Sequence, residues 1–259
     1  MPDLDDWPNW DVPFSGAPRL LRELGGGYTN RTYLIEVDES LWAVRLDTPD
    51  GKRLGIDRER EAAVVQRAVA AGLSPAVAFH SLEHGVLITA YIDGGPLDTE
   101  TLAEPGKLER FLDFVKRVHE LKIETPRLDY YAHAERYWRT LGESGIECPD
   151  ALIRARDEVL AGRSRYPLTP FEARLCHHDL TPQNFIENGD QLYLLDWEYA
   201  AYGAPVFDYA AICVEWSVPI GRLQEHTGAD LEELRHAVAL YRYTCGLWML
   251  INRASGLGA

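Results

Sequence analysis

Leu175-Cys-His-His-Asp-Leu-Thr-Pro-Gln-Asn184, followed shortly by Tyr193-Leu-Leu-Asp-Trp-Glu198, decides the fold of this 259-residue chain. The first stretch contains His-x-Asp, with an Asn five residues after the Asp. Asn188-Gly189 separates two short apolar runs, which predicts a hairpin turn between two strands. The second of these strands delivers Asp196, so the pattern combines two carboxylates and one amide.

Asp179, Asn184 and Asp196 are side chains that suit phosphoryl transfer. In protein kinases, an Asp with an Asn five residues later forms the catalytic loop, and a downstream Asp holds magnesium. The reaction needs one carboxylate near the acceptor hydroxyl, and an amide and a second carboxylate on the metal. So short a pattern also arises by chance, so the interpretation depends on the segments that precede it.

The composition is that of an ordinary globular protein, with 46% hydrophobic and 26% charged residues. The length allows one large domain or two coupled lobes. A net charge of −15 argues against a nucleic-acid partner or an anionic membrane, which would require a basic face. The acidity is compatible with a cationic small-molecule substrate, and equally with a simple gain in solubility.

The four cysteines are widely spaced and form no CxxC pair, so we expect buried thiols in a reduced cytoplasm. The acidic start resembles no signal peptide, and no run of 18 apolar residues predicts membrane insertion. The sequence therefore predicts a cytoplasmic protein, and it leaves the oligomeric state open.

The first 93 residues predict a small lobe of strands and one helix. Residues 1–18, with Trp7 and Trp10, read as an arm that packs on the body. Expected strands are Leu20-Leu21, Thr32–Val37, Leu41–Leu46, Pro75–Phe79 and Val86–Tyr91, and a helix runs from Asp57 to Gly72. A hinge is expected at Asp93-Gly-Gly-Pro96.

Two features of this lobe suggest nucleotide binding. Gly25-Gly-Gly-Tyr-Thr-Asn30 lies between two strands, where backbone N–H groups can cover phosphates, although three glycines are also typical of a flexible hairpin. It is neither a Walker A loop nor a dinucleotide-binding turn. Arg45 on the third strand stands where a protein kinase carries its phosphate-binding Lys, although an isolated Arg on a strand is most often a solvated residue. By analogy with the strand-lysine/helix-glutamate ion pair of kinases, we expect Glu61 on the helix to pair with it.

Residues 94–259 predict a mainly helical second lobe. Apolar residues recur at helical spacing over Leu108–Leu121, more weakly over Tyr131–Leu141 and Ala151–Leu160, and again over Pro205–Trp216 and Leu231–Asn252. The expected fold class is therefore α+β and two-lobed, with an antiparallel sheet in the amino-terminal lobe.

In this order, these segments resemble the choline kinase/aminoglycoside phosphotransferase family, which has a protein-kinase-like fold. The likeness covers nearly the whole chain after residue 18. The segments Asp196-Trp-Glu-Tyr-Ala-Ala-Tyr202, Phe207-Asp208, Glu215-Trp216 and Gly246-Leu-Trp248 are similar to the choline/ethanolamine kinase branch.

The resemblance implies ATP and Mg²⁺ as cofactors and a compact cationic alcohol, choline first, as the acceptor. It implies that Asp179 is the catalytic carboxylate, that Asn184 and Asp196 are metal ligands, and that Asp208 braces the catalytic loop. The implied nucleotide-binding residues are Gly25, Gly26, Gly27, Thr29, Asn30, Arg45, Glu61 and Tyr91. The implied acceptor-binding residues are Glu215, Trp216, Trp248, Tyr199 and Tyr202, because a carboxylate and aromatic faces suit a quaternary ammonium. Trp216 and Trp248 could equally be core residues.

Two positions depart from the family pattern. His178 occupies a position that is usually glycine, and Cys245 stands where choline kinases often carry another Trp. Both affect the choice of acceptor and leave the phosphoryl-transfer residues complete. Ethanolamine, thiamine and aminoglycosides therefore stay open as acceptors, as do transfer of AMP instead of phosphate and a non-catalytic nucleotide-binding role.

Overall fold

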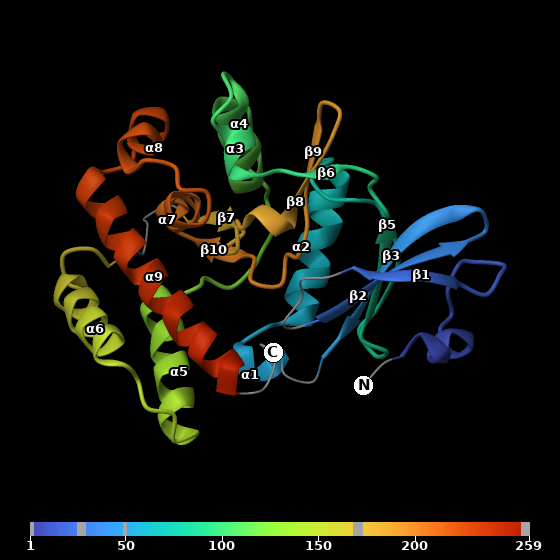
Figure 1. The fold of residues 1–259 in the computed structure, drawn as a ribbon, viewed down its shortest axis with the longest axis horizontal. Helices are drawn as coiled ribbons and strands as arrows, with labels where there is room; N and C mark the ends of the chain where they lie inside the picture. The colour runs from blue at the N-terminus through green and yellow to red at the C-terminus, as the bar shows by residue number, and fades with distance from the viewer. Residues whose placement is uncertain (1–2, 25–29, 49–50, 168–172, 255–259) are drawn as a thin grey trace. The chain divides into compact units, whose positions relative to one another are not determined.

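The computed structural model describes residues 3–24, 30–48, 51–167 and 173–254 (Figure 1). Its contacts divide the chain into two units, described separately below. The first contains Met1–Leu97 and Gln183–Tyr199, and the second contains Asp98–Pro182 and Ala200–Ala259. The predicted division at residue 93 stays a prediction, and the contacts add a segment of the carboxyl-terminal half to the first unit.

A five-stranded antiparallel sheet forms the centre of the first unit. Its strands are β1 (Arg19–Leu24), β2 (Asn30–Val37), β3 (Ser40–Asp47), β4 (Val77–Ser81) and β5 (Val86–Ala90), in the order β1-β2-β3-β5-β4. All five predicted strands are confirmed. Asp38 and Glu39 connect β2 to β3 with φ of 51° and 59°, the conformation of a tight two-residue hairpin turn.

The amino-terminal arm packs on this sheet, as the sequence predicts. A short 3-10 helix, η1 (Leu4–Asn9), carries Trp7, and Trp10 follows it. Both indoles are buried with Ile35, Val44 and other apolar side chains of the sheet. The two rings lie 5.8 Å apart, so the aromatic arm closes one part of the apolar core.

The helix predicted from Asp57 is α2 (Arg58–Ala70), and a single turn, α1 (Gly51–Leu54), precedes it. Asp57 caps α2, because its side chain accepts a hydrogen bond from Arg60 N at 3.0 Å. Val64, Val65 and Ala68 are buried along one face. The Asp57 cap and the buried apolar face explain why this segment forms a helix that begins at Arg58. Glu61 therefore lies in the first turns of α2.

A second, three-stranded sheet explains why residues 183–199 belong to the first unit. It consists of β6 (Gly95–Pro96), β8 (Phe185–Asn188) and β9 (Gln191–Leu194) in the order β6-β8-β9. The predicted hairpin is confirmed between β8 and β9, and Gly189 in its turn has φ of 56°. Gln191 Nε2 also donates to Gly72 O at 2.9 Å, so the hairpin contacts the end of α2.

The second unit is mainly helical. Its helices are α3 (Thr99–Leu102), α4 (Lys107–His119), α5 (Tyr130–Glu143), α6 (Asp150–Gly162), α7 (Pro205–Glu215), α8 (Ile220–Thr227) and α9 (Leu231–Ala254). Two short strands, β7 (Arg174–Cys176) and β10 (Ala201–Gly203), pair antiparallel, and a 3-10 turn, η2 (Pro182–Asn184), precedes β8. The long helix α9 packs against α5, α6, α7 and α8.

Three short helices and the cysteines differ from expectation. Periodicity did not indicate α1, α3 or α8, because four to eight residues contain too few turns to show a period. All four cysteines are free, but only Cys176 is buried, whereas Cys148, Cys213 and Cys245 are half-buried. The expectation of four buried thiols is therefore wrong for three of them.

Gly94 provides a test of the contact between β6 and the β8–β9 hairpin. A Cβ atom at Gly94 would lie 2.4 Å from Glu187 O, whereas one at Gly95 would meet nothing within 4 Å. Gly94→Ala should therefore lower the free energy of unfolding by about 1–3 kcal/mol. Gly95→Ala, the matched control, should change it by less than about 0.5 kcal/mol. Urea titrations with equal midpoints for the two variants would contradict this packing.

Candidate active site

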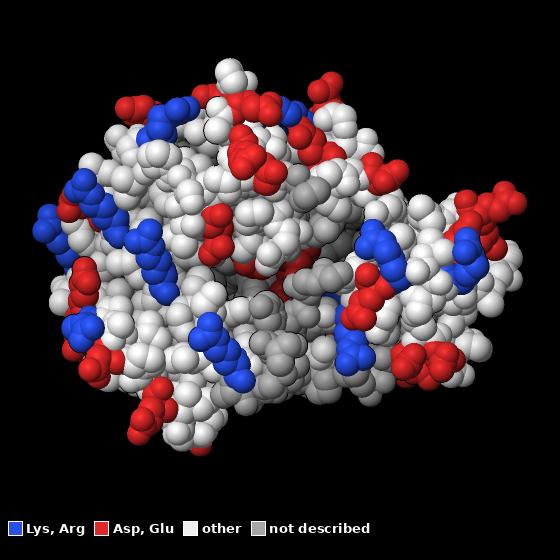
Figure 2. Space-filling view, viewed as in Figure 1, with Lys and Arg blue, Asp and Glu red and all other residues white. Residues whose placement is uncertain are grey.

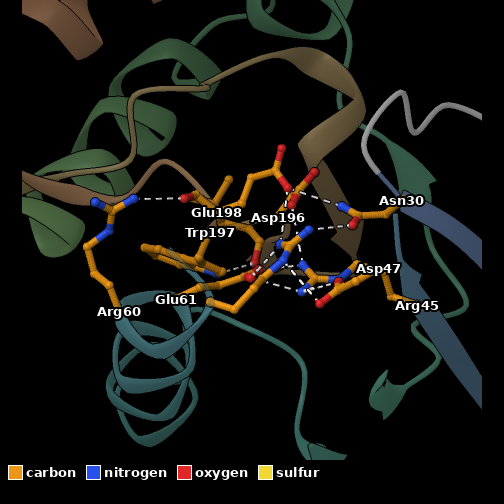
Figure 3. Close-up of polar contacts among 10 residues, drawn as sticks. Asn30, Arg45, Asp47, Arg60, Glu61, Asp196, Trp197 and Glu198 are labelled. Atoms are coloured by element: carbon orange, nitrogen blue, oxygen red, sulfur yellow. Dashed lines mark hydrogen bonds and ion pairs between the residues drawn. The ribbon is translucent and has the colours of Figure 1, made fainter. Parts of the chain in front are cut away.

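Arg45 and Glu61 form the predicted ion pair in the first unit (Figure 3). Arg45 on β3 donates from both terminal nitrogens to the two carboxylate oxygens of Glu61 on α2, and the Nη2–Oε2 distance is 2.9 Å. Glu61 has no exposed surface and Arg45 is 9% exposed. The pair joins a strand to a helix and holds the guanidinium in one orientation.

Asp196 is the second carboxylate that Arg45 contacts, with 3.5 Å between Nη1 and Oδ1. It follows β9 and has φ of 55°, a left-handed conformation that costs roughly 1–2 kcal/mol for a residue other than glycine. The neighbouring Leu195 N donates to Asn184 O at 2.8 Å. This bond connects the two predicted metal-ligand segments and helps to hold Asp196 in its unusual conformation.

The ion pairs among these buried side chains determine the protonation states of Glu61 and Arg45. Burial alone would raise the pKa of Glu61, but Arg45 and Arg58 outweigh it and lower this pKa to about 2. Burial would also lower the pKa of Arg45, but Glu61 and then Asp196 and Asp47 raise it above its usual value. Burial raises the pKa of the adjacent Asp47 carboxyl. Arg45 therefore stays cationic.

A second set of contacts, which sequence reasoning missed, surrounds this group. Arg58 at the start of α2 contacts Glu61, and also Asp47 Oδ2 at 3.1 Å and Glu198 Oε2 at 3.2 Å. Arg60 Nη2 donates to the Glu198 carbonyl at 3.1 Å. The signal was present in the charged first turn of α2 and in the Asp-Trp-Glu motif, but nothing in the sequence pairs these two segments.

Asn30 joins the same contacts. Its Nδ2 donates to Glu198 Oε2 at 3.1 Å, and its Oδ1 accepts from Arg58 Nη2 at 2.6 Å. The side chain is buried and connects β2, α2 and the segment after β9. These contacts are structural, and the nucleotide contact predicted for Asn30 stays a prediction.

The donor set of Asn184 and Asp196 fits magnesium. Both offer oxygen, the ligand type that Mg²⁺ prefers, and the Asp196 side chain is 29% exposed, so it is accessible to an ion that keeps several waters. The described residues contain one other cluster of possible ligands, His119, Cys176 and Asp208 in the second unit, within 4.8 Å of one another. Soft and hard donors are mixed there, and the Asp208 oxygens already accept hydrogen bonds.

Asp208 braces the loop that carries Asp179, as the sequence predicts. Its two carboxylate oxygens accept from His177 N at 3.0 Å and from His178 N at 2.8 Å. His119 Nε2 on α4 also lies 2.9 Å from Oδ2. Burial alone would raise the pKa of Asp208, but the hydrogen bond and charge of His119 and the contacts of His178 lower it to about 2. The ionised carboxylate fixes the backbone immediately before Asp179.

The backbone conformation of His178 is one that glycine adopts most easily. Its φ of 69° is left-handed, and its ring lies against Gly203, where an added Cβ would come within 2.7 Å of Cε1. Tyr130 and the His178 Nδ1 are hydrogen-bond partners, and the two rings pack edge to face at 4.9 Å. The loop accommodates the imidazole through Tyr130, Asp208 and a glycine opposite.

The predicted acceptor residues are divided between the two units. Glu215 is the last residue of α7 and is half-buried, and Trp248 on α9 is half-buried too. Tyr202 lies on β10, whereas Tyr199 belongs to the first unit. Tyr241, which sequence reasoning missed, donates from its hydroxyl to Glu215 Oε1 at 3.2 Å. The roles of these residues in acceptor binding stay predictions.

Trp216 contacts the loop that carries Asp179. It is 1% exposed, its ring centroid lies 4.7 Å from that of Phe111, and Nε1 donates to Leu180 O at 2.7 Å. These contacts are those of a core residue with a satisfied indole N–H. An acceptor contact for Trp216 stays a prediction.

The structure describes only some of the other predicted nucleotide-binding residues. Gly25, Gly26, Gly27 and Thr29 lie outside the described residues. Tyr91 is half-buried at the end of β5, and its N donates to Leu41 O at 3.2 Å. Its assignment to the nucleotide stays a prediction.

Figure 2 shows basic and acidic side chains interspersed over one face. Among the residues that the structure describes, no helix combines the length and the hydropathy needed to cross a bilayer.

The two-lobed α+β architecture, with a five-stranded antiparallel sheet and a strand-to-helix ion pair, defines a protein-kinase-like fold. Residues 20–241 match the phosphotransferase enzyme family (APH), and the chain belongs to this family.

Three relatives illustrate the match. Protein LicA of Haemophilus influenzae is 27% identical over 208 residues, which are 79% of this chain and 58% of LicA. The chain thus spans less than two thirds of that relative. A choline/ethanolamine kinase family protein from Mesorhizobium loti has a similar structure (TM-score 0.73, 25% identity, 95% of this chain and 83% of the other). Choline kinase LicA from Streptococcus pneumoniae shares the fold (TM-score 0.77, 23% identity, 92% of this chain and 87% of the other).

The low pKa of Glu61 has a consequence for stability. Because the folded-state pKa is about 2 and the ordinary value is 4.5, ionised Glu61 stabilises the fold above pH 4.5, and this contribution is lost as the pH falls towards 2. Glu61→Gln should lower the free energy of unfolding at pH 7 by about 3 kcal/mol. The difference from wild type should shrink as the pH falls from 4.5 to 2.

Glu59→Gln is the matched control, because Glu59 is exposed in the same turn of α2. It should change the free energy of unfolding by less than about 0.5 kcal/mol. Denaturant titrations at several pH values measure both differences. A constant gap between Glu61→Gln and wild type across this range would show that the ion pair does not carry the effect.

Proposed function

We propose that this protein is an ATP-dependent kinase that transfers the γ-phosphate to the hydroxyl of a compact cationic alcohol. The observation that carries the proposal is the position of Arg45, held by Glu61 and 3.5 Å from Asp196. In a kinase, a cation beside the metal-binding carboxylate is the arrangement that nucleotide phosphates require. Membership of the phosphotransferase enzyme family supports the same reaction.

Each group has a defined task in this proposal. Asp179 orients the acceptor hydroxyl and accepts its proton, while Arg45 binds phosphate oxygens. Asn184 and Asp196 hold Mg²⁺, which supplies charge neutralisation on the phosphates when it is bound. Asp208 keeps the Asp179 loop in place through two backbone hydrogen bonds. All of these groups are present, which favours a catalytic protein over a non-catalytic nucleotide-binding one.

Choline is the first acceptor to test, ahead of ethanolamine and thiamine. Two similar structures carry choline kinase or choline/ethanolamine kinase family in their names. Glu215 and Trp248 provide a carboxylate and an aromatic face, the combination that suits a quaternary ammonium. An aminoglycoside carries several ammonium groups and would ask for more carboxylates. Product masses after incubation with ATP and each acceptor separate phosphate transfer from AMP transfer.

Asp179→Asn should remove most turnover and leave nucleotide affinity nearly unchanged. Loss of the general base reduces kcat by roughly 10²–10⁴-fold. The dissociation constant for ATP should stay within about threefold, because the binding groups remain. Asp196→Ala should weaken magnesium-nucleotide binding as well. Asp190→Asn, an exposed change at the β8–β9 turn, is the control. Normal turnover in Asp179→Asn would end the assignment of Asp179.

Glu215→Gln and Trp248→Ala should each raise KM for the acceptor much more than KM for ATP. An aromatic contact with a cation contributes roughly 0.5–2 kcal/mol, so Trp248→Ala should raise the acceptor KM by roughly 2- to 30-fold. Met249→Ala provides the control, since Met249 is next to Trp248 on α9 and is 55% exposed. Steady-state kinetics in both substrates measure the split. If neither variant changes the acceptor KM, the acceptor site has been misplaced.

A further inference from the structure

One face of α9 presents Tyr241, Cys245 and Trp248, spaced four and three residues apart. Residues at this spacing lie above one another on a helix. Tyr241 is 6% exposed and its ring lies 6.5 Å from that of Phe207 on α7, edge to face. The face therefore packs towards α7, the helix that ends at Glu215.

Glu215 occupies an unfavourable position for a carboxylate. It is the last residue of α7, where the helix dipole presents its negative end. Burial also raises the pKa of its carboxyl, and the hydrogen bond from Tyr241 opposes that rise. A donor is therefore needed at this place if the side chain is to stay ionised in one orientation.

Tyr241 supplies that donor. Its hydroxyl donates to Glu215 Oε1 at 3.2 Å and also shares a hydrogen bond with the Cys245 thiol. Burial is the main reason why the pKa values of Tyr241 and Cys245 are raised, and the charge of the Asp179 carboxylate adds to the rise in both. The hydrogen bond from Tyr241 on α9 thus ends at Glu215, the last residue of α7.

We propose that Tyr241 is a positioning residue for the acceptor: its hydroxyl orients the Glu215 carboxylate that binds the acceptor's cationic group near Asp179. The inference rests on the proposed function and adds a residue to it. Tyr241, one turn before Cys245 on the same face of α9, makes the hydrogen bond with Glu215.

Tyr241→Phe removes the hydroxyl and keeps the ring in place. The acceptor KM should rise roughly tenfold, the loss expected for a hydrogen bond to a charged group. The KM for ATP and kcat should stay within about twofold of wild type. Tyr243→Phe is the matched control, because Tyr243 is equally buried on α9 but faces Arg156 and Glu135. It should leave all three constants unchanged.

A double-variant comparison separates positioning from a general loosening of the fold. In a Glu215→Gln background, Tyr241→Phe should add little, because both changes remove the same interaction. Additive effects, or equal increases in KM for ATP and acceptor, would overturn the inference. If the enzyme phosphorylates the acceptor but Tyr241→Phe and Tyr243→Phe have the same acceptor KM, the inference about Tyr241 is also overturned. In that case the proposed kinase activity still holds.

Binding of tetramethylammonium, measured by calorimetry, tests the inference without turnover. Wild-type protein and Tyr243→Phe should bind this cation equally, and Tyr241→Phe should bind it roughly tenfold more weakly. If wild type phosphorylates none of the tested alcohols but shows this difference, the positioning role holds and the proposed reaction fails. If the cation does not bind to wild type, the inference is overturned.

Discussion

A carboxylate without any exposed surface must be compensated, and each unit of this protein is built around one such group. Removing a charge from water costs several kcal/mol, so the residue persists only with ionic and hydrogen-bonding partners. Glu61 has Arg45 and Arg58, which tie α2 to β3. Asp208 has His119 and two backbone N–H groups, which tie α7 to α4 and to the loop after β7. In both cases the compensating groups are those that orient the candidate active-site residues. The same positions therefore carry both stability and the proposed function.

Two residues with strained backbone conformations lie in the segments of the candidate active site. His178 and Asp196 both have left-handed backbones, with φ of 69° and 55°, and neither is a glycine. Such conformations cost of order 1–3 kcal/mol and persist only where the surroundings over-determine them. For His178 the compensation is the hydrogen bond to Asp208 and the contact with Tyr130. For Asp196 it is the contact with Arg45 and the neighbouring bond from Leu195 to Asn184. Side-chain and backbone contacts outside helices and strands thus hold His178, next to Asp179, and Asp196 itself.

The two ends of the proposed reaction differ in how they are built. On the phosphate side, charged residues from β3, α2 and the segment after β9 contact one another directly. On the acceptor side, the candidate carboxylate stands at the end of a helix and depends on a phenol from another helix. Trp216, adjacent in sequence to Glu215, faces the core and holds Leu180. Two residues that are adjacent in the sequence therefore have different surroundings, because Trp216 is buried in the core whereas Glu215 is only half-buried.

Local pattern in the sequence determined the elements and the paired positions that depend on period and order. Strand-forming runs between turn residues predicted the five strands, and apolar spacing predicted the longer helices. The resemblance to known kinases predicted the Arg45–Glu61 pair and the Asp208 brace. The sequence did not predict the short helices, because one or two turns contain too few residues to show a helical period. The tertiary structure alone decided which distant side chains meet. Asn30 and Glu198 are 168 residues apart, and Tyr241 and Glu215 are 26 apart on different helices. Periodicity assigns a residue to a face of an element, but only the packing of elements decides which partner that face meets, because hydrogen bonds and ion pairs act over a few ångströms of space and not along the chain.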